Sequence, residues 1–347
     1  MSRLAVVLFN LGGPDRLEAV EPFLFNLFND PAIIGVPGPL RWVLAKLISK
    51  RRGPVARDIY RQLGGGSPLL SNTEAQAAGL EKELGGNAKV FVSMRYWHPR
   101  SAIVAEAVKA YDPEQVLLIP LYPQFSTTTS GSSLKDWRRA ARQAGLAAPT
   151  RSLCCYPADA GFVAAMANRV RPLYETAQKS GTPRVLFSAH GLPKKIVDRG
   201  DPYQYQVERT AAAIAEALGI AGLDHVVCYQ SRVGRLEWIG PATEDEIRRA
   251  GADGVPLVVA PIAFVSEHSE TLVELDIEYR RLAAEVGVPA YLRAQTVGDS
   301  PGFIAGLARQ ARLVQTANTP ICGQDGGRFC PAPSGRAYTA CPLNGMV

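Results

Sequence analysis

The sequence predicts an α/β protein built from two halves, each a parallel sheet covered by helices. Short apolar runs rich in Val, Ile and Leu alternate with segments of helical periodicity, which is typical of parallel sheets. The alternation starts again after about residue 150. At 347 residues, the chain is long enough for two domains with sizeable cores. We therefore expect a cleft between two similar halves.

The composition is that of an ordinary globular protein, with 47% hydrophobic and 20% charged residues. The net charge of +6 favours an anionic surface or ligand, but it is too diffuse to indicate nucleic acid. The apolar run at the N-terminus is too short for a signal peptide, and nothing in the sequence indicates a membrane span. We expect a cytoplasmic protein, in which six cysteines indicate metal binding or core packing before disulfides.

The first half begins with a buried strand over residues 4–11. Gly12 and Gly13 follow it, and a glycine pair there allows either close approach to a ligand or a tight turn. A Ser, Thr and Gly-rich loop covers residues 122–133. The other elements expected here are a helix at 16–28, a helix from a capping box at 71–74 to Leu84, a strand at 89–94, a helix at 102–111, a strand at 115–120 and a helix from about 134.

Residues 31–52 combine an apolar helical face with basic residues. The apolar face contains Leu40, Val43, Leu44, Leu47 and Ile48. One interpretation is an ordinary core helix. The other is an apolar lip with a basic rim, suited to a membrane interface or to a flat apolar ligand.

The second half repeats the alternation of strands and helices. It contains no extended G-x-G-x-x-G or Walker pattern, so the sequence gives poor support for nucleotide binding. The expected elements are a helix at 158–179, a strand at 184–188, a helix at 206–218, a strand at 225–230, a helix at 244–250, a strand at 256–264, a strand at 289–292 and a helix at 302–316.

We expect the chain to be organised around the stretch at 261–279, where a buried strand ends and a helix begins at Ser266 or Ser269. Glu270, Glu274 and Glu278 recur every four residues and would line one helical face, with His268 just before them. One interpretation is a solvated acidic face. The other is a row of oxygen ligands and proton acceptors headed by an imidazole.

Five stretches taken together resemble the ferrochelatases over about residues 4–316. They lie at 8–14, at 50–60 with 64–68, at 122–126 with 131–133, at 187–193 (Phe-Ser-Ala-His-Gly-Leu-Pro) and at 261–279. The resemblance is to bacterial protoporphyrin ferrochelatases, some of which contain a [2Fe-2S] cluster. It implies two Rossmann-like halves with parallel sheets flanking a porphyrin cleft. The implied activity is insertion of Fe²⁺ into protoporphyrin IX to form protohaem, with release of two protons.

The resemblance also implies the reactive residues. His190, in a loop after a strand, and Glu270 would form the central pair and contact the Fe²⁺ substrate. The sequence leaves two roles open for His190, metal ligand and proton acceptor. His268 and Glu267 would support Glu270, while Glu274 and Glu278 carry metal or protons along the helix.

The pocket walls also follow from the matching motifs. The arginines among them would pair with propionates, and the aromatic rings would press on the macrocycle. The implied residues are Asn10, Leu11, Arg52, Tyr60, Ser67, Arg95, Tyr96, Trp238 and Phe264.

The tail at 318–347 is polar, rich in Gly and Pro, and carries three cysteines. Such a segment needs a constraint to become ordered. We expect a [2Fe-2S] cluster or a zinc ion bound by Cys322, Cys330, Cys341 and one of Cys154 or Cys155. The wide spacing of the tail cysteines and Thr127, at a position where the family commonly has cysteine, depart from the family pattern. Cys228 is expected in the core.

The expected organisation is a first half at 1–150, a second half at 151–317 and a C-terminal extension at 318–347. Porphyrin and Fe²⁺ are the expected partners, with peripheral contact at the inner face of the membrane and no nucleic acid. Two other functions remain open. A cobalt chelatase acting on a corrinoid precursor is the nearest, and a non-catalytic porphyrin carrier would not need the carboxylate row.

Overall fold

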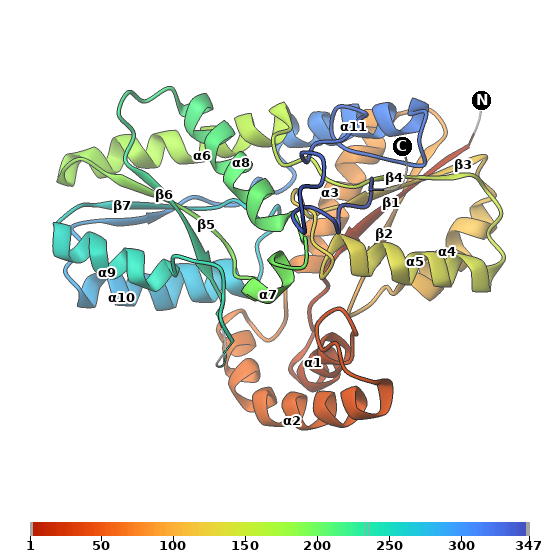
Figure 1. The fold of residues 1–347 in the computed structure, drawn as a ribbon, viewed down its shortest axis with the longest axis horizontal. Coiled ribbons are helices and arrows are strands. Elements are labelled where there is room, and N and C mark those ends of the chain that lie inside the picture. Colours follow the sequence, from red (N-terminus) through yellow and green to blue (C-terminus); the bar gives the residue numbers. More distant parts are fainter. Residues whose placement is uncertain (1–2, 233, 235, 345–347) are drawn as a thin grey trace.

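The computed structural model describes residues 3–232, 234 and 236–344, and these form two parallel sheets. The first sheet has the strand order β2-β1-β3-β4-β9, and the second has the order β6-β5-β7-β8. Figure 1 shows the two sheets end to end, with helices covering them and with α1 and α2 projecting below. The predicted α/β class and its parallel pairing are present in both halves.

The first sheet is built on β1, whose seven residues are all buried. Its strands are β1 (Leu4–Asn10), β2 (Ala88–Met94), β3 (Gln115–Pro120), β4 (Thr150–Leu153) and β9 (Ile321–Cys322). The short strand β9 comes from the C-terminal segment and pairs with β4. The tail is therefore attached to the first sheet by a strand.

The second sheet is built on β5, which lies between β6 and β7. Its strands are β5 (Arg184–His190), β6 (His225–Gln230), β7 (Leu257–Pro261) and β8 (Tyr291–Arg293). His190 is the last residue of β5, and so it lies on the strand and not in the loop that the sequence predicted. The expected strand at 256–264 is shorter because only Leu257–Pro261 pairs in the ladder.

The helices lie close to the predicted segments, and α5 and α8 start three or more residues earlier than predicted. They are α1 (Val20–Phe28), α2 (Gly38–Gln62), α3 (Leu69–Leu84), α4 (Ser101–Tyr111), α5 (Ser130–Ala144), α6 (Ala160–Ala177), α7 (Lys194–Val197), α8 (Tyr203–Leu218), α9 (Thr243–Asp253), α10 (Tyr279–Glu285) and α11 (Pro301–Thr316). Short 3₁₀ turns occur at η1 (Leu17–Ala19) and η2 (Gln178–Ser180).

The capping box predicted at residues 71–74 was wrong. Helix α3 already begins at Leu69, and the Ser71 hydroxyl donates to the carbonyl of Pro68 at 2.9 Å. Ser71 thus lies inside the first turn, where its side chain bonds backward along the helix. A serine inside a first turn and a serine before it look the same in sequence.

The stretch 270–278 is a π-helix (η3, Glu270–Glu278), which continues into α10. Its last turn shows the π pattern, because the amide of Tyr279 donates to the carbonyl of Glu274, five residues back. The predicted serine cap is absent, since the Ser269 side chain makes no capping bond. Instead, the amide of His268 donates to the Thr271 hydroxyl at 3.0 Å.

The two halves share one hydrophobic core. Leu8 of β1 and Phe187 of β5 belong to the same cluster of buried side chains, together with Phe162 of α6 and Phe303 of α11. Helix α11 packs against both α3 and α6. The relative placement of the halves is therefore fixed by buried apolar surface.

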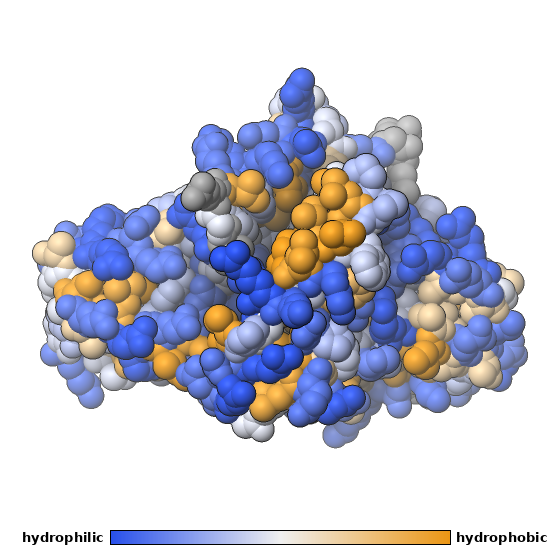
Figure 2. All heavy atoms as spheres, turned by 90° about the horizontal axis from the view of Figure 1, so that it is seen from below, coloured by the Kyte–Doolittle hydropathy of each residue, from blue (hydrophilic) through white to orange (hydrophobic). Residues whose placement is uncertain are grey.

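The segment predicted as a core helix or a lip projects from the body. The buried residues of α2 are mostly small, and the apolar stripe points to solvent: Leu40, Val43 and Leu47 are 51%, 46% and 62% exposed. Trp42 is 53% exposed beside them. Figure 2, which views this underside, shows hydrophobic side chains gathered near its centre and surrounded by hydrophilic ones. These four exposed side chains, called the lip patch below, argue against the core interpretation.

Candidate active site

The centre of the site is a histidine–glutamate pair at the carboxyl edge of the second sheet. The Nδ1 atom of His190, at the end of β5, lies 2.8 Å from Oε2 of Glu270, the first residue of the π-helix. The hydroxyl of Tyr203 donates to the carbonyl of His190 at 3.0 Å and fixes the strand end. In parallel sheets, ligands bind at this edge.

Ser231, just after β6, connects Glu270 to Glu274. Its amide donates to Oε1 of Glu274 at 2.8 Å, and its hydroxyl lies 3.0 Å from Oε2 of Glu270. The same hydroxyl also contacts Oε2 of Glu274. Ser231 adopts a left-handed backbone with φ of 60°, which is uncommon for a residue with a side chain.

The Ser231 hydroxyl has one proton and two carboxyl neighbours. If it donates to Glu270, the contact with Glu274 requires a proton on the Glu274 carboxyl. The electrostatics agree with that assignment. Burial opposes ionisation of Glu270, but the charge and hydrogen bond of His190, with help from His268 and Ser231, lower its pKa to about 2. Burial and the negative charge of Glu270 raise the pKa of Glu274 to about 7.

The Glu270 carboxylate favours the protonated form of His190. Burial lowers its pKa, but the nearby Glu270 carboxylate outweighs that effect and leaves the pKa above its ordinary value. Its side chain is 42% exposed, so it remains accessible from solvent. The arrangement thus places an exposed imidazole, an ionised carboxylate and a carboxyl that titrates near neutrality in one hydrogen-bonded chain.

His268 lies on the other side of Glu270, with Nε2 at 3.9 Å from Oε1 of Glu270. Its Nδ1 is 3.1 Å from the carbonyl of Ser266, which favours the tautomer with hydrogen on Nδ1. Phe264 packs on its ring with centroids 4.5 Å apart. His268 is buried, whereas His190 is half exposed.

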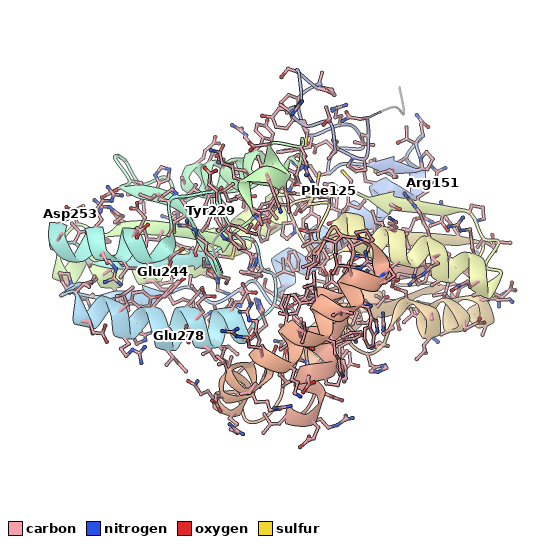
Figure 3. The ribbon with its side chains drawn as sticks, turned by 60° about the horizontal axis from the view of Figure 1, so that its bottom comes forward. Phe125, Arg151, Tyr229, Glu244, Asp253 and Glu278 are labelled. Carbon is pink, nitrogen blue, oxygen red and sulfur yellow. The ribbon has the colours of Figure 1, made fainter. Side chains whose placement is uncertain are left out.

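Glu278 does not join this group. It is exposed at the end of the π-helix (Figure 3), and no hydrogen bond or ion pair connects it with the residues around His190 among those described. Glu267 also points elsewhere, because its carboxylate accepts from Arg293 at 2.6 Å. The predicted acidic row is therefore two carboxylates at the site and one on the surface.

The residues of the first half that were predicted to line the pocket lie around the end of β1. Asn10 is buried, and its amide donates to Thr73 at 3.0 Å. Tyr60 is buried, with its pKa raised to about 12, chiefly by burial. Arg52 is exposed, with its guanidinium 5.9 Å from the ring of Phe28. Leu11 is half-buried and packs with the cluster that includes Tyr60.

The glycine pair after β1 serves close packing. Gly12 has φ of +86°, and a Cβ there would lie 2.9 Å from the amide nitrogen of Trp97. A Cβ on Gly13 would lie 2.5 Å from the hydroxyl of Ser67. Substitution at either position would push the 11–14 turn away from Ser67 and Trp97.

Arg95 and Tyr96 are already engaged inside the protein. The Arg95 side chain is 13% exposed and donates to Asp30 at 2.7 Å and to Ser132 at 2.7 Å. The Tyr96 hydroxyl donates to the same Asp30 carboxylate at 2.8 Å. Asp30 follows α1, so this cluster anchors the base of the lip. Arg95 is therefore not a free guanidinium, whereas Arg52 is exposed.

Trp238 lies beside His190 on the second half. A Cβ on Gly191 would meet its ring at 3.2 Å, and Pro193 forms a β-bridge with it. Its indole nitrogen is buried without a partner among the described residues. The six-membered ring of the Trp238 indole thus packs on the backbone that follows His190.

The cysteines form a separate buried cluster. Cys154, Cys155, Cys330 and Cys341 pack with Phe125, which Figure 3 labels near the sulfur atoms. The Sγ atoms of Cys154 and Cys155 are 3.2 Å apart. Gln206 donates to Sγ of Cys330 at 3.0 Å and to Sγ of Cys155 at 3.4 Å. All six cysteines are buried thiols without disulfides.

The donor atoms of this cysteine cluster suit a bound metal or iron–sulfur group, but the side chains are not placed as a metal site requires. Sulfur donors in an apolar pocket suit iron–sulfur or zinc binding. However, no three His, Cys, Asp or Glu side chains in the described part of the chain are placed to hold a metal ion. Cys322 packs in the main core instead, because it and Ile321 face opposite sides of β9. Cys228 is buried in the core of the second sheet, as predicted.

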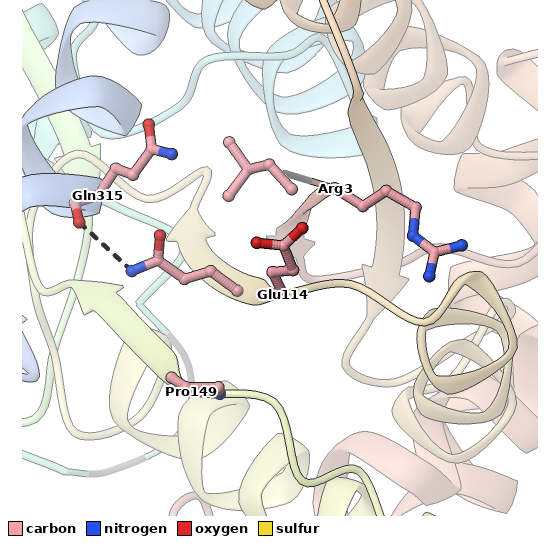
Figure 4. Close-up of a pocket in the computed structure, with 6 residues that line it drawn as sticks. Arg3, Glu114, Pro149 and Gln315 are labelled. Carbon is pink, nitrogen blue, oxygen red and sulfur yellow. Dashed lines mark hydrogen bonds between the residues drawn. The ribbon is translucent and has the colours of Figure 1, made fainter. Parts of the chain in front are cut away.

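A cavity of about 250 Å³ lies away from these residues, at the opposite edge of the first sheet (Figure 4). It is lined by Arg3, Leu4, Glu114, Gln115, Pro149 and Gln315. Five of these residues lie at the amino ends of β1, β3 and β4, and Gln315 lies in the last turn of α11. The cavity therefore has no part in the chemistry around His190.

Sequence reasoning missed Ser231, Tyr203 and Tyr279. The Tyr279 hydroxyl donates to Oε1 of Glu274 at 2.9 Å, which completes the environment of that carboxyl. A polar residue directly after a buried strand was a usable signal for Ser231. The two tyrosines lie within helices, and nothing in the sequence distinguishes them from core residues.

The fold and the site together define a protein with the chelatase fold. A sirohydrochlorin chelatase of Bacillus subtilis subspecies spizizenii in complex with cobalt aligns with a TM-score of 0.54 and 13% identity, covering 90% of this chain and 95% of that one. The Bacillus subtilis protein solved with Fe³⁺ aligns with a TM-score of 0.51 and 14% identity, covering 90% and 96%. At this identity the likeness concerns the fold, and it confirms the predicted class.

The sequence model of the family described as Ferrochelatase matches residues 3–314. A ferrochelatase of Phenylobacterium zucineum is 53% identical over 352 residues, covering 99% of this chain and 100% of the relative. A ferrochelatase of Caulobacter vibrioides is 52% identical over 346 residues, covering 96% and 98%. This chain belongs to the ferrochelatase family, as its motifs predicted.

Proposed function

We propose that the protein inserts Fe²⁺ into protoporphyrin IX to form protohaem and releases two protons. Identity of about one half over nearly the whole chain supports a ferrochelatase. The observation that carries the proposal is the 2.8 Å contact between His190 and Glu270, extended through Ser231 to Glu274. Metal insertion into a porphyrin must remove two pyrrole protons, and this chain of groups can accept and pass protons.

The ligand atoms of His190 and Glu270 also suit a metal ion that must be released to the porphyrin. One imidazole and carboxylate oxygens bind first-row divalent metals less tightly than thiolates, and the cysteines lie in a different cluster. We propose that His190 and Glu270 meet the Fe²⁺ substrate and the pyrrole protons, with His268 orienting Glu270. Glu274 can receive a proton through Ser231 only after its carboxyl has lost its own, which the pKa of about 7 allows near neutral pH. His190 has two proposed roles here, as a ligand of Fe²⁺ and as a proton acceptor.

The walls of the porphyrin site are proposed from the residues around this pair. Trp238 and Phe264 lie next to His190 and His268, and Asn10, Leu11, Tyr60 and Ser67 come from the first half. Arg52 is the exposed cation placed to pair with a propionate. Arg95 and Tyr96 contribute by fixing Asp30 and the lip.

The proposed activity is tested by an anaerobic absorbance assay with Fe²⁺ and protoporphyrin IX. Conversion to the haem spectrum is the expected result. Conversion of a corrinoid precursor by Co²⁺, with no reaction on protoporphyrin, would indicate the cobalt chelatase. Tight porphyrin binding without turnover by either metal would indicate a carrier.

We further propose that the lip patch contacts a membrane surface, in a cytoplasmic protein. No helix in the described part of the chain is both long and apolar enough to cross a bilayer. The support is the exposed set Leu40, Trp42, Val43 and Leu47, together with basic residues on the same helix such as Lys46 and Lys50. Apolar side chains with a basic rim suit an anionic lipid interface.

The [2Fe-2S] cluster is kept as a proposal with a changed ligand set. Cys155, Cys330 and Cys341 are the proposed ligands, and Cys154 is the fourth candidate because it shares their pocket. Cys322 is no longer included. The thiols are buried, and Gln206 donates to two of the sulfur atoms, which supports the proposal. The arrangement without metal does not itself form a metal site.

A further inference from the structure

Arg293, the last residue of β8, contacts both sides of the segment that carries Glu270 and Glu274. Its side chain is 5% exposed. Nη1 donates to Oε1 of Glu267 at 2.6 Å, and Nε donates to Oδ1 of Asp276 at 3.0 Å. Nη2 donates to the other oxygen of Asp276. Glu267 precedes the π-helix and Asp276 lies within it, so one guanidinium joins the two.

The π-helix is a conformation that needs such support. Most π-helical stretches are single turns inside α-helices, whereas η3 spans nine residues. Tyr291 lies two residues before Arg293 on β8, and its hydroxyl donates to the carbonyl of Leu275 at 2.7 Å. Two residues of β8 therefore hold the π-helix. Tyr291 donates to the main-chain carbonyl of Leu275, and Arg293 donates to the side chain of Asp276.

Glu267 also connects this arrangement to its surroundings. Its Oε1 accepts from the amide of Thr296 at 2.9 Å, and its carbonyl accepts from Asn72 of α3 at 3.1 Å. Its second carboxylate oxygen is buried without a partner in the described part of the chain. A buried ion pair of this kind is a poor way to gain stability, because desolvation offsets most of the attraction. The geometry that it imposes is the better explanation for its presence.

We propose that Arg293 is a positioning residue, which keeps residues 270–278 in the π-helical register so that Glu270 and Glu274 both reach Ser231. If the segment relaxed to an α-helix, the angle between Glu270 and Glu274 around the axis would change. One of the two carboxyls would then lose the Ser231 hydroxyl. The proposal rests on the proposed function, since its main effect is on metal insertion.

The chain offers a matched control in Arg184. This arginine is the first residue of β5, in the same sheet but at the opposite edge, with a side chain 10% exposed. It also donates to two carboxylates, Asp224 at 2.8 Å and Asp253 at 2.8 Å. Loss of either arginine removes its ion pairs with two acidic groups, but only Arg293 contacts η3.

The experiment compares wild type, Arg293→Gln, Arg293→Lys and Arg184→Gln. Melting temperature, kcat and KM for Fe²⁺, porphyrin binding by fluorescence quenching, and hydrogen exchange of peptides spanning 270–278 are measured for each. Both glutamine variants should melt at lower temperature. Only Arg293→Gln should lose about 10–100-fold in kcat/KM for Fe²⁺, a size typical of lost outer partners of a metal site.

Porphyrin binding should stay at the wild-type level, and exchange of 270–278 should speed up only when Arg293 is changed. Arg293→Lys should lose less kcat/KM for Fe²⁺ than Arg293→Gln, because lysine keeps the positive charge but lacks the planar guanidinium that contacts two carboxylates. Should Arg293→Gln fail to fold, Asp276→Asn provides the same readouts, since Asp276 is 27% exposed and the Arg293–Glu267 contact remains.

Equal kinetics and equal exchange for Arg293→Gln and Arg184→Gln would overturn the positioning role. Absence of iron insertion by the wild type would instead overturn the proposed function. In that case the hydrogen exchange of 270–278 still decides whether Arg293 holds the π-helix.

Discussion

The Nδ1 atom of His190 and Oε2 of Glu270 lie 2.8 Å apart, although the residues are 80 positions apart in sequence. They meet because β5 and β7 pair in parallel, so that the end of β5 and the segment after β7 leave the sheet at one edge. The contact couples an imidazole that is still open to solvent with a partly buried carboxylate. That coupling is the basis of the first two predictions.

His190→Ala and Glu270→Gln should each lower kcat by about 10²–10⁴-fold, the usual range for loss of a positioned acid or base. Both variants should keep the fold, because the His190 side chain is 42% exposed and Gln retains the hydrogen-bonding shape of Glu. Circular dichroism and the anaerobic haem assay check this. His225→Ala is the control, since His225 is exposed on β6. Wild-type turnover by either site variant would remove that residue from the mechanism.

Glu274→Gln and Glu278→Gln should separate the two interpretations of the acidic row. Glu274 contacts Ser231 and Tyr279, whereas Glu278 is exposed. We expect Glu274→Gln to reduce kcat by about tenfold or more, with the acid limb of the pH–rate profile near pH 7 abolished. Glu278→Gln should match the wild type. Equal losses in both would restore the continuous row that the sequence suggested.

Glu274 should also make stability depend on pH. Its pKa is about 7 in the folded protein, against an ordinary value of 4.5. The unfolded chain therefore releases this proton first, and the stability contributed by the neutral carboxyl is present below pH 4.5 and lost as the pH rises through 7.

Glu274→Gln stays neutral and avoids that loss. Above pH 7 it should be more stable than the wild type by about 1–3 kcal/mol, with the difference disappearing near pH 4. Urea unfolding at pH 4.5, 6 and 8 measures it. Glu278→Gln should show no such trend. A stability gap for Glu274→Gln that does not change with pH would contradict the assignment of a neutral Glu274.

How much the sequence could predict depended on how local each feature was. His190 ends a buried strand and Glu270 follows another, both within long motifs, and the family resemblance implied that they form a pair. The role of Arg95 could not be predicted in this way, since its partner Asp30 is 65 residues away. The π-helix was equally hidden, because its residues are ordinary helix formers and its register depends on contacts with Tyr291 and Arg293 of β8.

The lip patch gives a prediction for membrane contact. Trp42→Asp with Leu47→Asp should weaken binding to anionic liposomes by about tenfold for each side chain that inserts, because burying a large apolar side chain contributes roughly 1.5–3 kcal/mol. Since both side chains are more than half exposed, the melting temperature should not change. Flotation with liposomes and the haem assay in their presence provide the readouts.

Ile103→Asp is the control for the lip. Ile103 is 61% exposed on α4, away from the lip, and so carries the same chemical change at a different surface. It should leave liposome binding intact. If the lip variant and Ile103→Asp bind liposomes equally well, the lip patch does not mediate membrane contact.

The cysteine cluster gives the last prediction. Protein purified without oxygen should be red-brown and contain iron with labile sulfide. Cys330→Ser and Cys341→Ser should be colourless and should loosen the tail, because thiolate ligation couples metal binding to local folding. Cys322→Ser should keep its colour, since Cys322 faces the main core while Ile321 faces the cysteines.

Cys228→Ser is a second coloured control, because Cys228 is buried between strands of the other sheet. Colour loss in Cys322→Ser with colour retained in Cys341→Ser would return the ligand set to the one the sequence suggested. Zinc without iron or sulfide would leave a structural metal site in the same pocket. Metal-free protein with an unchanged melting temperature in Cys330→Ser would mean that packing around Phe125, and not a cluster, orders the tail.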